Sequence, residues 1–401
     1  MRPPVRHGIP RRRRRLRAGL VQLLCVLAGF GLGLAVPRIG RGPAVPARQV
    51  ADMLLAVALG VLGTTTVIFS LLFLVVQSAA TTFTPRLTLF RDAPIVWRTF
   101  ACAIGLAVFC GTAALADGGR SEVSAAVPVL TGLLLLTLLA LLRNLQLRAF
   151  AAIQLAPVLN SVTERGRTVL DTLYRGPAGP TAAPLSAPRS TVTWPKAPAV
   201  LQQVDVDRLL AAARAADTLV ALRATPGATL QHGTPIADVH GGELPASAVL
   251  GGLVTGDERT FDQDPMLAFR LLADIALRAL SPAVNDPATT VQALDGIEDL
   301  LGRPAAARAG PRRVADRTGV VRVVIPLPGW EDFLRTGLDD VIAAAVTAPM
   351  VLLRLRALLA RLRDGDHAPS DPLLTRRLSW VEEELADRFP RLVNGTGEER
   401  P

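Results

Sequence analysis

The chain has 401 residues, half of them apolar and only 19% charged, a balance that favours a membrane protein over a wholly soluble one. The formal net charge is +10, but residues 1–150 contain 17 arginines against 4 acids, whereas residues 151–401 contain 27 basic residues against 30 acids. The second part therefore lacks the basic surface that nucleic-acid binding needs, and we expect no nucleic-acid partner.

Four apolar runs predict a membrane domain of four transmembrane helices within residues 16–143. Each run has about 20 residues or more, which is the length that a helix needs to cross the ~30 Å hydrocarbon layer. The runs are Leu16–Val36, Met53–Gln77, Ile95–Ala116 and Val123–Leu142. The lipid bilayer is therefore the first expected partner.

Small residues interrupt the first two runs. Gly29, Gly31 and Gly33 lie in the first run, and Gly60 and Gly63 lie in the second. Glycines in such runs favour close helix packing. The neighbouring cluster at residues 64–66, three threonines, has two interpretations: hydroxyls bonded to their own helix, or the lining of a polar path.

The three cysteines, Cys25, Cys102 and Cys110, all lie in apolar runs. A thiol in such a setting usually behaves as a small hydrophobic group. Their odd number and the absence of a CxxC motif argue against a disulfide framework and against a thiolate metal site.

Arginines near the ends of the runs predict the orientation. The majority flank the N-terminus, the second loop and the end of the fourth run, which places residues 1–15 and everything after residue 143 in the cytoplasm. Because Lys196 is the only lysine, the composition indicates a GC-rich bacterial source and hence the bacterial inner membrane.

The basic N-terminus resembles a secretory signal, but three more spans follow it, so we expect a retained signal anchor. The second loop, Ser78–Pro94, is typical of an interfacial helix or a docking surface.

A helical extension and a proline-rich linker are predicted over residues 144–198, with a kink or break at Pro157. A cytoplasmic α+β domain is expected over residues 199–390, followed by a disordered tail, residues 391–401. Its predicted elements are a strand near residue 200, a helix capped by Asp205, short strands around residues 219–223 and 236–239, a strand at Gly319–Leu327, and helices at Trp330–Ala345, Met350–Arg363 and Leu373–Phe389.

Two histidines and an aspartate, His232, Asp238 and His240, lie close together in the sequence of the small β region. A metal site needs convergent ligands, and this spacing in turns is weak evidence for one. We therefore expect neither a metal nor a cofactor.

Two Asp-Pro pairs predict the starts of neighbouring helices, Pro265–Leu280 and Pro287–Leu301. An N-cap carboxylate accepts free backbone N–H groups, and proline in the first turn has a preset φ and lacks an N–H that would be unsatisfied there. Asp264 and Asp286 are thus the expected helix caps.

One polar stripe follows the first of these helices. It consists of Arg270, Asp274, Arg278 and Ser281, which project within 80° of one another on a helix that is otherwise largely apolar. A buried stripe costs several kcal/mol unless its charges are paired. It is therefore a satisfied structural network, a ligand or anion site completed by Asn285 and Asp286, or a catalytic site.

Three motifs carry a resemblance to a known family: RTFDQDP from Arg259, IALRALSPAVNDPATT from Ile275, and FTPRL with FRD in the loop after the second apolar run. They resemble the bacterial predicted-membrane-protein family catalogued as domain of unknown function 2254, over most of residues 15–345. The resemblance implies four N-terminal spans and a cytoplasmic C-terminal domain. It implies no established activity.

The common enzyme motifs are absent from the sequence. The leading hypothesis is a non-enzymatic membrane protein, either a channel- or transporter-like assembly or a ligand-sensing one, which we expect to be a homo-oligomer with a small anionic ligand as a further partner. The alternative is a membrane-anchored enzyme that acts on an anionic substrate at Arg270, Asp274 and Arg278.

Overall fold

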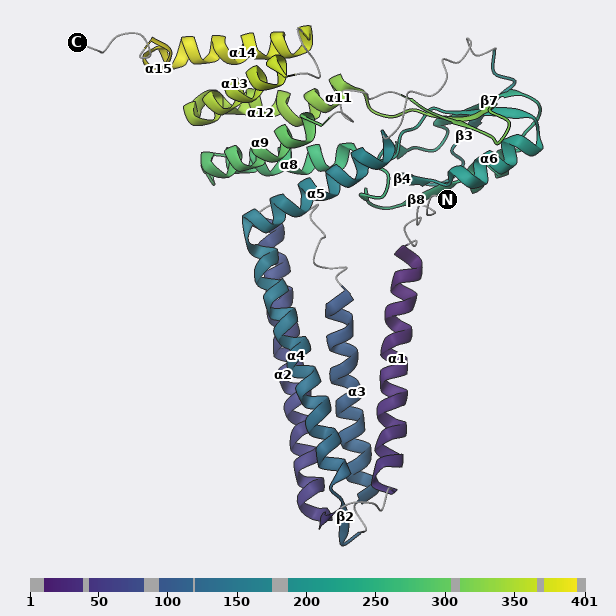
Figure 1. Cartoon of the computed structure of the whole chain (residues 1–401), viewed down its shortest axis with the longest axis vertical. Coiled ribbons are helices and arrows are strands. Elements are labelled where there is room, and N and C mark those ends of the chain that lie inside the picture. Colours follow the sequence, from purple (N-terminus) through teal and green to yellow (C-terminus); the bar gives the residue numbers. More distant parts are fainter. Residues whose placement is uncertain are drawn as a thin grey trace. The chain divides into compact units, whose positions relative to one another are not determined.

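The computed structural model describes residues 11–38, 43–82, 94–117, 120–174, 187–303, 311–365 and 371–394. The chain divides into two compact units, Met1–Gln154 and Leu155–Pro401, and each has a hydrophobic core of its own (Figure 1).

The described part of the first unit contains four helices that are long and apolar enough to cross a membrane, as the apolar runs predict. They are α1 Arg11–Ala35, α2 Ala47–Thr82, α3 Pro94–Asp117 and α4 Ala126–Ile153. A 3-10 turn, η1 Val36–Arg38, follows α1, and a short antiparallel ribbon pairs β1 Ala44–Pro46 with β2 Glu122–Ser124. The predicted interfacial segment lies mostly outside the described residues, since α2 takes in residues 78–82 and the next described residue is Pro94.

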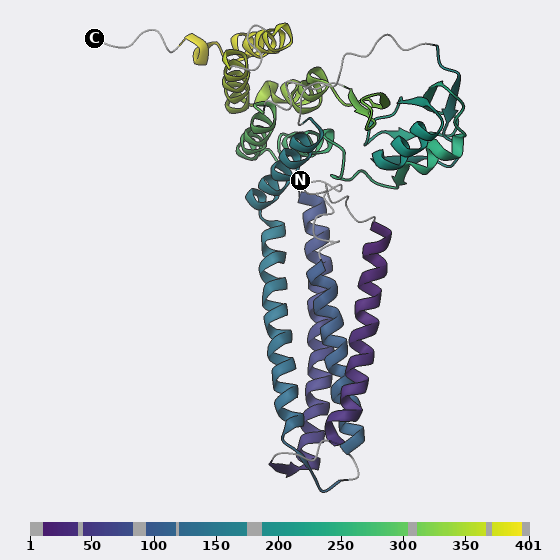
Figure 2. The same ribbon diagram turned by 45° about the vertical axis from the view of Figure 1, so that its right-hand side comes forward.

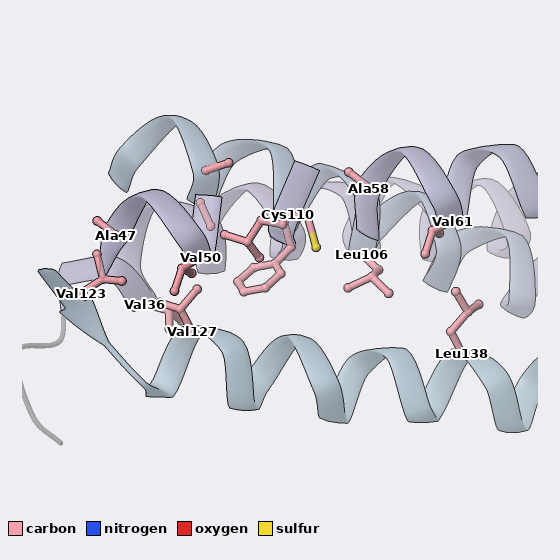
Figure 3. Packing of buried hydrophobic residues seen from close by; sticks show 14 of the residues in the cluster. Val36, Ala47, Val50, Ala58, Val61, Leu106, Cys110, Val123, Val127 and Leu138 are labelled. Carbon is pink, nitrogen blue, oxygen red and sulfur yellow. The ribbon is translucent and has the colours of Figure 1, made fainter. Parts of the chain in front are cut away.

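Helix α3 is the central helix of the first unit. In its most apolar stretch 56% of the residues are buried, whereas the corresponding share is 17% in each of the other three spans. It packs against α1, α2 and α4. Its position alongside α1 can be followed in both views (Figures 1 and 2). Figure 3 shows Leu106 and Cys110 of α3 among valines of α2 and Leu138 of α4. The thiol of Cys110 therefore belongs to the apolar core of the bundle.

Glycines allow α1 and α3 to approach each other closely. A Cβ added at Gly29 would lie 2.3 Å from the carbonyl oxygen of Gly105, and one at Gly33 would lie 2.9 Å from that of Phe109. The predicted packing role is thus confirmed for these two glycines. It is wrong within this chain for Gly31, Gly60 and Gly63, because nothing lies within 4 Å of a Cβ at any of these positions.

Hydroxyl groups in the spans return to their own helices. Thr66 donates to the carbonyl of Leu62 at 2.9 Å, and Ser70 donates to the carbonyl of Thr66 at 3.0 Å. Thr99, Thr112, Thr131 and Thr137 make the same kind of bond to the preceding turn. Within the cluster, Thr66 thus fits the first interpretation, because a hydroxyl bonded in this way satisfies its donor without a polar path, whereas both interpretations stay open for Thr64 and Thr65.

The expected break near Pro157 is present, but it lies three residues earlier. Helix α4 ends at Ile153, Gln154 is extended, and α5 runs over Leu155–Leu173. A proline ring clashes with the carbonyl four residues before it, which for Pro157 is that of Ile153. The predicted helical extension is thus present as α5, but this helix belongs to the second unit, which begins at Leu155 and not at residue 199.

Two small sheets are found among the described residues of the second unit. The five-stranded sheet has the order β3-β7-β5-β10-β9, with β5 and β10 parallel and the other pairs antiparallel, and the three-stranded sheet has the order β6-β4-β8. The strands are β3 Ser190–Thr193, β4 Ala199–Val204, β5 Thr218–Leu222, β6 Thr229–Leu230, β7 Pro235–Gly241, β8 Leu253–Gly256, β9 Arg312–Ala315 and β10 Val321–Ile325. Strand β3 lies in the stretch that was expected to be a linker, so this part of the prediction is wrong.

The other regular elements described in the second unit are helical. They are α6 Val206–Ala215, α7 Ala246–Gly251, α8 Met266–Ala279, α9 Pro287–Leu301, α11 Trp330–Leu334, α12 Asp340–Ala344, α13 Pro349–Asp364, α14 Pro372–Arg388 and α15 Pro390–Asn394. Asp205 caps α6 as expected, since its carboxylate accepts the N–H of Arg208. Helix α15 occupies residues 390–394, four of which were expected in the disordered tail, and residues 395–401 lie outside the described residues.

The predicted helix Trp330–Ala345 is interrupted by a π-helical turn, η2 Arg335–Asp339, and ends in a 3-10 turn, η3 Ala345–Thr347. A Cβ at Gly337 would lie 3.2 Å from Ile297 and 3.4 Å from Phe269. The turn thus packs tightly against α8 and α9. π-turns of this kind often mark functional regions.

Candidate functional site: the Arg278 corner at the end of helix α8

The segment before α8 is held by a buried ion pair. Arg259 donates from Nε and a terminal nitrogen to the two carboxylate oxygens of Asp264, at 2.6 and 2.9 Å. The side chain of Asp264 is 1% exposed and also accepts the N–H of Met266 at 3.1 Å. Asp264 thus bonds to the first turn of α8, but the residue in the N-cap position is Pro265.

Two further contacts fasten the same segment. The Gln263 amide accepts the N–H of Val204 at 2.9 Å and donates to its carbonyl at 3.1 Å, and Phe261 lies 5.5 Å from the guanidinium of Arg165. Gly227, at φ +94°, has no room for a Cβ, which would meet the carboxylate of Asp264 at 2.4 Å. The RTFDQDP motif is therefore a structural junction of β4, α5 and α8, and the roles of Arg259 and Gln263 were not predicted.

The polar stripe of α8 is satisfied at one end. Arg270 contacts Asp274 at 3.0 Å and Asp340 at 3.6 Å. The Arg270 side chain is 35% exposed and that of Asp274 is 16% exposed. The stripe is thus partly exposed rather than buried, because it lies where α8 meets the end of the π-turn and not inside the core.

Arg278 lies at the other end of the stripe, two helical turns or about 12 Å from Arg270. Within the described part of the chain its guanidinium has no hydrogen-bonding or ion-pair partner, and its Nε is buried. The stripe therefore does not act as one site: Arg270 and Asp274 bind each other, and Arg278 is left alone.

The turn after α8 folds back onto the helix end. The Ser281 hydroxyl donates to the carbonyl of Arg278 at 2.7 Å, the N–H of Asn285 donates to the carbonyl of Ser281 at 2.8 Å, and the N–H of Asp286 donates to that of Ala279 at 2.8 Å. Asn285 has φ +48° and an exposed side chain. We call Arg278 together with Ser281–Asp286 the Arg278 corner.

Asp286 is the N-cap residue of α9. Its carboxylate accepts the backbone N–H of Thr289 at 3.1 Å and the Thr289 hydroxyl at 2.5 Å. These bonds, the hydroxyl first, lower the pKa of Asp286 below that of an ordinary aspartate. Its two oxygens are thus engaged within α9, which leaves Arg278 and the exposed amide of Asn285 as the groups of the corner that can meet a ligand.

His232, Asp238 and His240, the candidate metal ligands of the β region, do not form a group of three that could hold a metal ion. Asp238 accepts from Arg223 at 2.6 Å and from the Thr191 hydroxyl at 2.7 Å. Among the residues that the structure describes, no group of three or more His, Cys, Asp or Glu side chains could hold a metal ion.

A charge cluster that the sequence did not reveal joins α9 to α13. Glu298 accepts from Arg361 at 2.6 and 2.8 Å and also from Arg354, and Arg354 contacts Asp295 at 2.7 Å. Burial acts to raise the pKa of Glu298, but the bonds from Arg361 and Arg354 hold that pKa below the ordinary value.

We expect Glu298→Gln to destabilise the second unit by about 1–2 kcal/mol at pH 7, since bonds to charged groups are worth about 1.5–3 kcal/mol and this one is partly exposed. Because the folded-state pKa of Glu298 is lowered, the stability that its bonds to the two arginines contribute is present above the unfolded pKa. That stability is lost as the pH falls through the folded-state pKa. Denaturant unfolding at pH 7 and pH 4 measures both effects. The exposed Glu383→Gln is the control, and a loss that persists undiminished at pH 4 would contradict the electrostatic explanation.

Comparison with known proteins identifies the family. The model of the family described as "Predicted membrane protein (DUF2254)" matches residues 17–361. The chain is similar to the uncharacterized proteins Mb1321c of Mycobacterium bovis and Rv1290c of Mycobacterium tuberculosis, with 31% identity over 350 residues in each case. The matches cover 79% of this chain and 64% of each relative, so the chain spans somewhat less than two thirds of their length. No solved structure matches it. The residues that form the buried junction and the Arg278 corner lie inside the matched range, and the chain belongs to the DUF2254 family of predicted membrane proteins.

Proposed function

We propose that this protein is a membrane-anchored sensor whose second unit binds a small oxyanion, a carboxylate or a phosphate, at the Arg278 corner. The observation that carries the proposal is the Arg278 guanidinium, which lacks an acceptor among the described residues although its Nε is buried. A buried donor without an acceptor costs about 1–3 kcal/mol. An anion would supply that acceptor.

The position of Arg278 in the last turn of α8 has a partial structural explanation. A cation near a helix C-terminus is stabilised by the helix dipole by about 0.3–1 kcal/mol. The dipole favours the charge, but it supplies no acceptor for the buried Nε–H. A guanidinium has five donors in a planar fork that matches two oxygens of a carboxylate or phosphate, so an oxyanion fits the unsatisfied group.

Sensing fits the geometry better than transport or catalysis. Several span hydroxyls, those of Thr66, Ser70 and Thr131 among them, bond to their own helices, so these groups offer no free donor to a transport path within one chain. An enzyme at the polar stripe would need a carboxylate free to accept a proton, whereas Asp274 is paired with Arg270 and Asp286 is bonded to Thr289. We also propose, from the distribution of arginines at the span ends, that the Arg278 corner faces the cytoplasm.

The test is a thermal shift of the full chain in detergent with inorganic phosphate and with succinate. At about 100 times the Kd, a ligand that binds only the folded state stabilises it by about 2.7 kcal/mol, which raises the midpoint by about 5–10 °C in a unit of this size. We expect Arg278→Gln to abolish this shift. Arg214→Gln, an exposed arginine in the last turn of α6, is the matched control. Equal shifts in the two variants would exclude the Arg278 corner as the site.

A further inference from the structure

Asp117 is a buried acid at one end of the membrane unit. It is the last residue of α3, its exposed fraction is 1%, and neither carboxylate oxygen has a hydrogen-bonding partner among the described residues. The other acids of the described first unit, Asp52 and Glu122, are exposed. Buried carboxylates are rarely left unpaired, because removing a charge from water without a partner costs many kcal/mol.

Among the residues that the structure describes, the charged groups around Asp117 do not neutralise it. Arg120 is the one that acts on it electrostatically, but its guanidinium donates to the carbonyl of Pro37 and forms no ion pair with Asp117. Arg38 of η1 donates to the carbonyl of Leu34, and Arg48 of α2 is exposed. The ionised form of Asp117 therefore remains without direct compensation in the part of the chain that the structure describes.

The helix itself also opposes a negative charge at this position. The C-terminal end of a helix carries about half a negative charge, so a carboxylate there is disfavoured. Burial, the missing partners and the helix end thus act in the same direction. Retaining an acid at this point is costly for the fold unless the acid is neutral or binds a cation.

We propose that Asp117 is a proton-binding site of the membrane unit. The proton comes from water, forms an O–H bond to one carboxylate oxygen, and returns to water when the site is exposed, so the exchange needs no other reactant. A proton fits better than a metal cation, because a metal needs several further oxygen ligands and the nearby Pro37 carbonyl already accepts from Arg120. Acids inside membrane domains commonly serve proton pathways or proton-linked conformational changes.

Infrared spectroscopy of the full chain in lipid nanodiscs tests the proposal. The spectrum at pH 7 should contain the carbonyl stretch of one protonated carboxyl group per chain, and Asp117→Asn should remove it. Asp52→Asn changes an exposed acid of the same unit and should leave the band in place.

The thermal midpoint gives a second measurement that does not depend on assigning the band. Asparagine has nearly the shape of a neutral aspartic acid, so Asp117→Asn should leave the midpoint at pH 7 within about 2 °C of the wild type, which corresponds to under about 1 kcal/mol. The wild-type band is observable even if the variant does not fold. Absence of the band from wild-type protein at pH 7, or its survival in a folded Asp117→Asn variant, would overturn the proposal.

Discussion

Replacing Arg259 with alanine should destabilise the second unit by about 3–5 kcal/mol, because it removes one partner of a buried ion pair and leaves the other uncompensated. Asp264 would keep only the backbone N–H groups of the first turn of α8, and its side chain has 1% exposure to water. Denaturant unfolding followed by tryptophan fluorescence reports this loss, since Trp194, Trp330 and Trp380 lie in the second unit and Trp97 lies in the first.

The pH dependence of the Arg259→Ala variant provides an internal check. Burial raises the pKa of Asp264 above the ordinary value, and Arg259 opposes that shift. Without Arg259 the folded-state pKa rises further. A carboxyl group with a raised folded-state pKa favours the folded state below its unfolded pKa, where it is neutral, and this stability is lost as the pH rises and the group ionises. The loss of stability of the variant relative to the wild type should therefore shrink as the pH falls toward 4.

The matched control is Arg189→Ala. Arg189 pairs with Glu243 at 2.6 Å, but both side chains are more than half exposed, and such pairs contribute about 0–1 kcal/mol. If the two alanine variants lost equal stability, the buried junction would not have the role that its geometry indicates.

Gly29→Leu should separate α1 from α3. The backbone carbonyl of Gly105 occupies the space of the new Cβ, with a contact of only 2.3 Å, so relief requires movement of a whole helix rather than of a side chain. Overpacking in a core costs about 1–3 kcal/mol, and a clash with backbone belongs at or above the upper end of that range. We expect a lower thermal midpoint of the detergent-solubilised chain, measured by loss of the monodisperse peak in size-exclusion chromatography after heating.

Gly31→Leu is the control for this experiment. It adds the same side chain to the same helix, two residues further along, where nothing lies within 4 Å. Its midpoint should remain close to that of the wild type. A comparable loss in both variants would show that helix propensity or lipid contact, and not α1–α3 packing, determines the effect.

The sequence predicted the spans well because a length of about 20 apolar residues is a strong signal by itself. The cap at Asp286 was also predictable, since capping depends on residues within one turn. Strand β3 was missed because its hydrogen bonds to β7 join residues more than 40 positions apart, and it lies in a proline-rich stretch that otherwise indicates a linker.

The candidate site was predictable only in part. Helical periodicity located Arg270, Asp274 and Arg278 on one stripe, but the partner of Arg270 from another element, Asp340, lies 70 residues away on α12. Nothing local distinguishes the paired arginine from the unpaired one. The burial of Asp117 is not predictable from the sequence for a related reason: an acid at the end of an apolar run usually marks the boundary of a span, and only the fold shows that this one is buried.

If the Arg278 corner binds one small oxyanion per chain, equilibrium dialysis of the intact protein in nanodiscs against radiolabelled phosphate and a labelled dicarboxylate will detect the bound anion. We expect saturable binding of one of these anions at one site per chain, lost in Arg278→Gln and retained in Arg214→Gln. Binding that is absent in the folded wild-type protein, or unchanged in Arg278→Gln, would contradict it.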